Sequence, residues 1–260
     1  MPSLPRMIIG AALFAVAHAA ALAASDDLTT FSVGAEYSSG DYGAPQKTDI
    51  FYVPFAVKHE TGPWAFKLTV PYVEITGPGN VIGAGGDQIV VGPGNAPRRT
   101  ASGLGDVVAT AFYNVLDDRK APVGLDLGAK VKLGTANEAE GLGTGENDYS
   151  LQADLFKTVG ALTPFASIGY RWYGDPPGVD FRNVFYGSVG AAYRFSKQTT
   201  GGVAYDFRGA VFAGGPRVSE LTGYVSQRLS QNVKLQVYAI AGFSDASPDF
   251  GAGLNLSYSY

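Results

Sequence analysis

Strict alternation of apolar and polar residues recurs along this chain and limits its possible folds more than any other feature. Between Val123 and Leu133 every odd position is apolar, while the even positions hold Gly, Asp, Gly, Lys and Lys. The same period of two runs through 233–243 and 250–260. A period of two indicates β-strands with one apolar face. Each segment has the roughly 9–11 residues that a tilted strand needs to cross a bilayer.

Applied to the whole chain, the pattern predicts about 12 strands, an even number as in bacterial outer-membrane barrels. They are expected near 29–39, 48–59, 64–75, 104–115, 123–133, 148–158, 163–173, 184–195, 200–211, 218–229, 233–243 and 250–260. Short and long connections alternate between them, which is typical of a barrel with tight periplasmic turns and extended outer loops. The sequence therefore predicts an all-β fold, a transmembrane antiparallel β-barrel with both termini in the periplasm.

A soluble β-sandwich or lipocalin-like barrel also alternates, and aromatic residues argue against it. Aromatic side chains lie on the apolar face near strand ends, as in the girdles of membrane barrels. They are Trp64, Tyr72, Tyr113, Tyr170, Trp172, Tyr193 and Tyr258. Nearly all the expected strands also exceed the five or six residues usual in soluble sheets. The membrane barrel is therefore favoured.

The two ends of the chain carry export signals. Arg6, an apolar stretch from Met7 to Ala17 and an A-x-A site at Ala21–Ala23 predict a secretory signal peptide, 1–24, that is cleaved. Residues 25–260 then form a single barrel domain located in the bacterial outer membrane. Tyr258 and Tyr260 end the last strand in a pattern that resembles the C-terminal signal read by the barrel-assembly machinery. We expect that machinery and outer-membrane lipid as partners of a monomer.

Composition excludes several kinds of site. The chain has 0 Cys, so it has neither a disulfide framework nor a thiolate metal site. Its net charge of −4 includes no basic run, and no nucleic-acid partner is expected. His59, beside a tight turn, is the one histidine after the signal peptide, so an outer-membrane enzyme or a zinc site is not expected. We expect no catalytic residues, no cofactor and no metal.

The face opposite the apolar one is polar and charged, and it must line the interior of the barrel. Closing 163–173 on 148–158 brings Arg171 near Ser150 and Asp148, and Lys132 returns to the same height. By the same argument Arg208 lies near Glu220 across the 212–217 loop. These charges either form structural ion pairs or a selectivity constriction for solute. The candidate lumen residues are Lys130, Lys132, Asp148, Arg171, Arg208 and Glu220.

A long Gly-rich segment, 76–103, is expected to fold over or into the mouth of the barrel. Loops of this length are usually functional or disordered, and the sequence leaves both alternatives open. About 12 strands lie between the filled interior of eight-stranded barrels and the aqueous channel of 16–18 strands. A narrow or gated path is therefore expected.

Two short motifs resemble a known family. The run from Ser102 to Tyr113, which begins Ser-Gly-Leu-Gly-Asp, and the Pro71-Tyr72 pair are similar to segments of the MetA-pathway of phenol degradation family. The resemblance implies an outer-membrane channel for aromatic or other small organic compounds. We expect passive diffusion of small solutes through the barrel. The alternatives are a non-conducting structural or surface-interaction barrel and, with less support, an outer-membrane enzyme.

Overall fold

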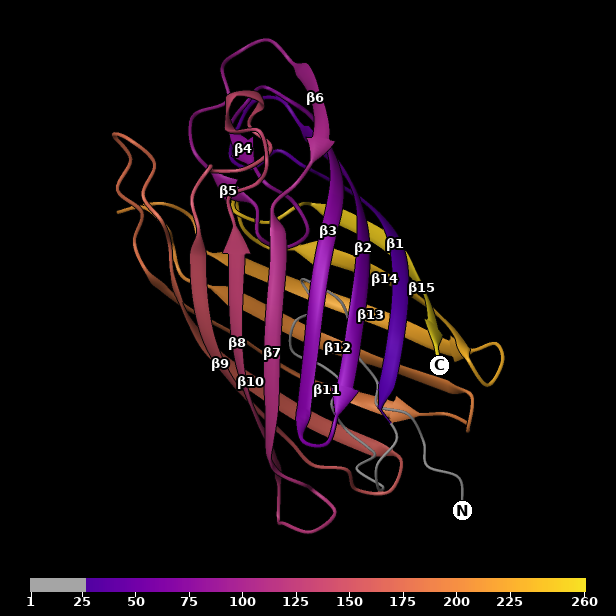
Figure 1. Cartoon of the computed structure of the whole chain (residues 1–260). Coiled ribbons are helices and arrows are strands. Elements are labelled where there is room, and N and C mark those ends of the chain that lie inside the picture. The colour runs from indigo at the N-terminus through magenta and orange to yellow at the C-terminus, as the bar shows by residue number, and fades with distance from the viewer. Residues whose placement is uncertain (1–26) are drawn as a thin grey trace.

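The computed structural model describes residues 27–260, which form one closed antiparallel β-barrel (Figure 1). The predicted signal peptide, 1–24, lies outside the described residues. The strands are β1 Leu28–Gly40, β2 Thr48–Thr61, β3 Trp64–Gly77, β4 Val81–Ile82, β5 Ile89–Val90, β6 Arg99–Leu104, β7 Val107–Leu116, β8 Gly124–Leu133, β9 Asp148–Phe156, β10 Leu162–Trp172, β11 Val184–Arg194, β12 Thr199–Arg208, β13 Val218–Arg228, β14 Val233–Gly242 and β15 Phe250–Ser259.

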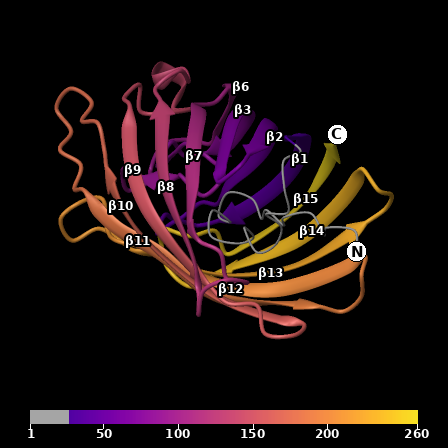
Figure 2. The ribbon, with the colours of Figure 1, turned by 60° about the horizontal axis from the view of Figure 1, so that its bottom comes forward.

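The main sheet has 13 strands, and they make a barrel of 12 because β6 and β7 share one position in it. Both pair with β3, β6 along its second half and β7 along its first. The sheet closes where β2 pairs with β3. Viewed from the turn end, the strands surround a common interior (Figure 2). The fold is thus the all-β barrel of about 12 strands that the sequence predicts.

Apolar side chains face outward and polar side chains face the interior, the reverse of their distribution in soluble proteins, as β9 illustrates. Leu151 on its outer face is 56% exposed, whereas Asp148 on its inner face is 3% exposed. The burial pattern of β9 alternates at every residue, with polar side chains buried and apolar ones outward up to the last residue, Phe156, which is buried. Water would have to solvate this apolar exterior if the barrel were soluble, at a cost of about 25 cal/mol for each Å² exposed. The distribution suits a barrel whose outer face meets lipid.

The first and last strands, β1 and β15, pair with each other as neighbours in the ring of strands. β1 pairs with β15 in a register that sets Thr30 opposite Ser259, and the Phe31 and Tyr260 rings stack with centroids 6.0 Å apart. Backbone bonds between Thr29 and Tyr260 extend this ladder to the last residue. The start of β1 and the last residue therefore lie at the end that carries the short turns, and the long segments gather at the opposite end.

Aromatic side chains cluster on the outer face near strand ends. Trp64 lies edge-on to Tyr113 at 4.8 Å between ring centroids, close to the turn end of the barrel. Near the loop end, Tyr170 contacts Trp172 and Phe185 in the same edge-on manner. Outside the strands the described residues hold one short 3-10 turn, Glu138–Glu140. None of the helical segments described has the length and apolarity to span a membrane.

A β-bulge separates β6 from β7, at the Gly-Asp pair of the Ser-Gly-Leu-Gly-Asp motif. Tyr72 pairs with Leu104 but Thr69 pairs with Val108, so residues 105–107 face only residues 70–71. One extra residue reverses the in-and-out phase of the strand. A Cβ on Gly105 would approach a side-chain methyl carbon of Val73 to 2.8 Å, so the position needs glycine. The bulge explains why the pattern predicts a strand only from 104.

Part of the segment predicted as a loop, 76–103, is strand. Residues 99–104 form β6, and β4 and β5 form a small hairpin of their own. The hairpin lies beside β6 at the end of the barrel away from the chain termini (Figure 1). We call residues 81–90 the inner hairpin, and residues 83–88 its tip.

Candidate functional site

The inner hairpin folds into the mouth of the barrel instead of standing above it. Its Gly85 has a φ of +68°, and a Cβ there would lie 2.5 Å from the Tyr52 ring. Tyr52 is a buried, inward-facing residue of β2. The tip can contact the wall this closely only because glycine has no side chain and tolerates positive φ.

The base of the inner hairpin is tied to the first long loop, 41–47, through Asn80. This residue is almost fully buried; its side-chain amide donates to Tyr42 O at 3.4 Å and its side-chain oxygen accepts from Thr48 Oγ1 at 3.2 Å. The backbone oxygen of Asn80 also accepts from Val91 N at 2.8 Å. These bonds fix where the segment enters and leaves the hairpin.

Two apolar clusters hold the hairpin from opposite sides. On one side Val81 packs with buried residues of β2, β3 and β6, including Ile50, Val73 and Ala101. On the other side Ile89 packs with Tyr173, Phe181, Val184 and Val211. Because apolar side chains from the hairpin and the wall bury each other, the segment is an ordered part of the fold.

Three positively charged side chains from the wall bind the hairpin tip. Lys130 on β8 places Nζ 3.1 Å from Asp87 Oδ2, and Arg171 on β10 places Nη2 2.7 Å from Asp87 Oδ1. Arg208 on β12 donates to two backbone carbonyls of the tip, Gln88 O at 2.6 Å and Gly86 O at 3.3 Å. We call Lys130, Arg171 and Arg208 the cationic arc.

The cationic arc keeps Asp87 ionised. Burial acts to raise the pKa of this carboxyl group, but the charges of Arg171, Lys130 and Arg208 outweigh it and hold the pKa well below its ordinary value. The contribution to stability is therefore complete above the ordinary pKa of about 3.9 and is lost only as the pH falls below that value. At neutral and mildly acidic pH the tip stays attached.

A row of carboxylates lies on the wall farther from the mouth. Cross-strand pairing joins Asp126 to Asp154, then runs through Ser167 and Ser188 to Asp206 and Glu220. We call Asp126, Asp154, Asp206 and Glu220 the carboxylate belt. Lys130 is four residues from Asp126 on the same strand, about 13 Å, and Arg208 is two residues from Asp206, about 7 Å. The lumen thus presents cationic side chains at the mouth and a row of carboxyl groups below them.

A cavity of about 60 Å³ lies between the cationic arc and the carboxylate belt. Arg171 and Arg208 line it together with Asp206, Glu220 and Asp87 of the hairpin tip. Within the described residues, Asp206 Oδ2 and Glu220 Oε1 have no hydrogen-bond partner, and the same holds for the Nε atoms of Arg171 and Arg208. The cavity therefore has both donor and acceptor capacity to spare.

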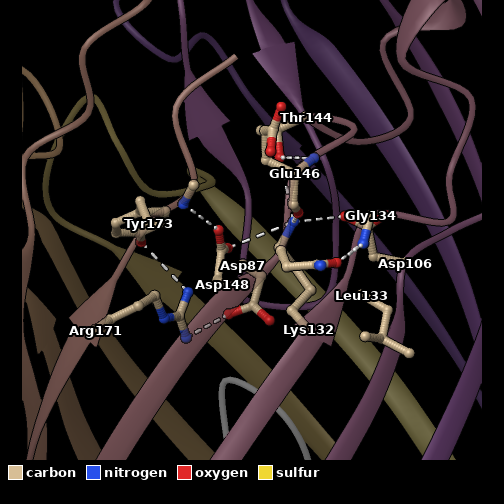
Figure 3. A network of polar contacts seen from close by, with 12 residues as sticks. Asp87, Asp106, Lys132, Leu133, Gly134, Thr144, Glu146, Asp148, Arg171 and Tyr173 are labelled. Atoms are coloured by element: carbon tan, nitrogen blue, oxygen red, sulfur yellow. Dashed lines mark hydrogen bonds and ion pairs between the residues drawn. The ribbon is translucent and has the colours of Figure 1, made fainter.

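Lys132 and Asp148, two of the residues that the sequence nominates, form an ion pair beside this cavity (Figure 3). Lys132 Nζ lies 3.4 Å from Asp148 and 2.8 Å from Asp106, the aspartate of the Ser-Gly-Leu-Gly-Asp motif. Arg171 stands opposite Ser150 in the β9–β10 register, but its guanidinium binds Asp87 and donates to Tyr173 OH at 3.3 Å. The network is thus centred on Asp87 more than on Asp148.

Arg208 and Glu220 line the same cavity, although neither is the other's cross-strand partner. Arg208 pairs with Val218, and Glu220 pairs with Asp206. The residue that sequence reasoning missed is Asp87, which joins the arc from a loop 43 residues away from Lys130. A readable signal was present, since Val81-Ile82 and Ile89-Val90 flank a Gly-rich turn as strands of a hairpin do.

We expect Gly85→Ala to detach the hairpin tip, because the new Cβ collides with Tyr52. Overpacking of this kind costs about 1–3 kcal/mol. In a chain with 0 Cys, Gln88→Cys gives a single buried thiol at the tip. Maleimide labelling of that thiol should be about tenfold faster with Gly85→Ala, which corresponds to about 1.4 kcal/mol.

Gly79→Ala is the matched control, since Gly79 also has positive φ but a Cβ there meets nothing within 4 Å. Labelling rates that rise equally in the two variants would trace the effect to backbone strain and not to the Tyr52 contact.

His59 lies away from this site. Its Nδ1 is 3.0 Å from Thr29 Oγ1 near the turn end, on the same strand face as Phe55 and Val57. Among residues 27–260 no group of His, Cys, Asp and Glu is arranged to hold a metal ion. The chemistry available at the mouth is therefore that of charged side chains facing a small cavity.

Comparisons with known proteins identify both a family and a fold. A family model described as "Putative MetA-pathway of phenol degradation" matches residues 25–260. No curated protein matches the chain. Among solved structures, the NanC porin aligns with 88% of this chain and 98% of its own at 11% identity, with a TM-score of 0.57. The KdgM porin aligns with 88% and 99% at 11% identity and a TM-score of 0.49. At 11% identity the likeness to the NanC porin is one of fold.

Proposed function

The chain belongs to the MetA-pathway of phenol degradation family, and we propose that it is a bacterial outer-membrane channel through which small solutes diffuse passively. One observation carries the proposal. The barrel has a large apolar exterior around an interior lined with charged and polar side chains, as the exposed Leu151 and buried Asp148 exemplify. Such a wall suits lipid on one side and water on the other.

The orientation follows from the connections. Outer-membrane barrels have short periplasmic turns and long outer loops, so both termini lie in the periplasm and the inner hairpin lies at the cell surface. The partners are outer-membrane lipid and, through Tyr258 and Tyr260, the barrel-assembly machinery. The protein acts as a monomer without cofactor, and its solutes are small organic compounds, aromatic ones included, as the family description suggests.

Ion conductance in planar bilayers tests this function. Refolded protein should give discrete single-channel currents, because a polar interior admits water and ions. The packed inner hairpin favours a second candidate, a non-conducting barrel with a surface role. Absence of current both from this protein and from a variant with a detached hairpin tip would favour that candidate and would sink the channel.

A further inference from the structure

The cationic arc surrounds Asp87 in the way that a carboxylate-binding site surrounds its ligand. An ammonium and a guanidinium contact one carboxylate together: Lys130 Nζ lies 3.2 Å from Oδ1 and 3.1 Å from Oδ2, and Arg171 Nη2 lies 2.7 Å from Oδ1. Charge-assisted hydrogen bonds of this geometry are among the strongest polar contacts in proteins. Asp87 is a carboxylate supplied by a loop, whereas Lys130 and Arg171 belong to the wall.

We propose that Lys130, Arg171 and Arg208 form a binding site for small solutes that carry a carboxylate group, and that Asp87 occupies it as an internal competitor. The inference rests on the proposed channel function and deepens it by naming a class of solute. Binding of such a solute to the arc releases the tip of the inner hairpin from the wall. The bound solute thereby promotes opening of the lumen through which it diffuses.

The three cationic side chains should keep their positions when Asp87 leaves the site. Lys130, Arg171 and Arg208 stand on β8, β10 and β12, each held by backbone ladders on both sides. Asp87 follows Gly85 and Gly86, both with positive φ, in a turn that such residues make easily deformable. The wall is thus the fixed partner and the carboxylate the exchangeable one.

Two N–H groups of the cationic arc make no hydrogen bond within residues 27–260, so the arc can bind more acceptor atoms than Asp87 provides. The Nε atoms of Arg171 and Arg208 are buried and have no hydrogen-bond partner among the described residues, and both arginines line the 60 Å³ cavity. The Tyr186 ring lies 5.5 Å from the Arg171 guanidinium and also lines the cavity. It offers a flat surface to the non-polar part of a solute.

The carboxylate belt restricts the charge that the solute can carry. Asp206 and Glu220 line the cavity on the side away from the mouth. A second negative group directed at them would meet carboxyl groups instead of the cations that its charge requires in a partly desolvated space. The site therefore favours solutes with one carboxylate over those with two.

Calorimetric titration of refolded protein in detergent tests the proposal, with benzoate as the probe and benzamide as its neutral counterpart. In Asp87→Asn the arc has no internal competitor, so benzoate should bind at least tenfold more tightly than to the wild type. Benzamide should show no saturable binding to either protein. Adding Arg171→Gln to Asp87→Asn should lower benzoate affinity at least tenfold.

Asp180→Asn is the matched control, because Asp180 is an exposed aspartate of another outer loop. It removes the same charge from the same end of the barrel and should leave benzoate affinity at the wild-type value. Circular dichroism establishes that each variant is folded. Equal benzoate affinity in wild type and Asp87→Asn, or equal binding of benzoate and benzamide, would overturn the proposal.

The two proposals fail separately. Calorimetry in detergent measures the site whether or not the barrel conducts. Benzoate binding without ion current in any variant would contradict the channel and leave the carboxylate site intact. Ion current without preferential benzoate binding to Asp87→Asn would support the channel and contradict the carboxylate site.

Discussion

Asp87→Asn should increase the fraction of time that the channel is open by at least tenfold. The substitution keeps the size of the side chain and removes its charge, so Lys130 and Arg171 are left facing each other without their shared anion. Breaking a buried ion pair by removing one partner costs about 3–5 kcal/mol. Asp87 is 16% exposed, which reduces that figure, but about 1.4 kcal/mol already suffices for a tenfold change.

Single-channel recording in planar bilayers measures this effect. Asp180→Asn serves again as the charge-matched control and should behave as the wild type. The prediction fails if folded Asp87→Asn and wild type show the same open fraction, since apolar packing and the Arg208 bonds to backbone carbonyls would then suffice to hold the tip.

The second large effect concerns the outer face of the barrel. Ile168→Arg should destabilise the protein in phospholipid vesicles by about 2–4 kcal/mol, because it places a charge near the middle of the lipid-facing surface. Ile168 lies in the middle of β10 and is 55% exposed. On the exterior of a soluble barrel the same substitution would have almost no effect.

Leu162→Arg is the depth control for this prediction. Leu162 lies on the same face of the same strand, at its turn end, and is 44% exposed. A charge near the membrane interface costs only about 0–1 kcal/mol. Free energies of unfolding, from urea titration in vesicles, should therefore differ between the two variants. Equal values would show that the apolar face does not meet a bilayer as proposed.

The strands were predictable because the environment imposes a period of two on each of them. The pattern predicts 233–243 and the strand runs Val233–Gly242, and similar agreement holds around the barrel. The exception is the β6–β7 position. There the bulge at Gly105 and Asp106 reverses the phase, so a single alternating pattern stops at residue 104 and misses β6.

Strand periodicity alone predicts only the wall side of the candidate site. Lys130, Arg171 and Arg208 follow from strand parity, since each alternates with outward apolar residues. Asp87 does not, because its contact with Lys130 crosses the lumen and depends on the path of a loop. Strands of two residues, such as β4 and β5, are also too short for periodicity to reveal.

The inner hairpin is attached by two kinds of contact that respond differently to the medium. At its base, Asn80 and the Val81 cluster form a hinge of packed and hydrogen-bonded groups, on which salt has little influence. At its tip, Asp87 and the cationic arc form ion pairs. Their strength falls as ionic strength rises, but by less than for exposed pairs, because the Lys130 and Arg171 side chains are only 7% and 6% exposed. The tip should therefore detach from the wall while the base stays packed at Asn80. A cell in fresh water should keep the tip attached more firmly than a cell in a saline medium.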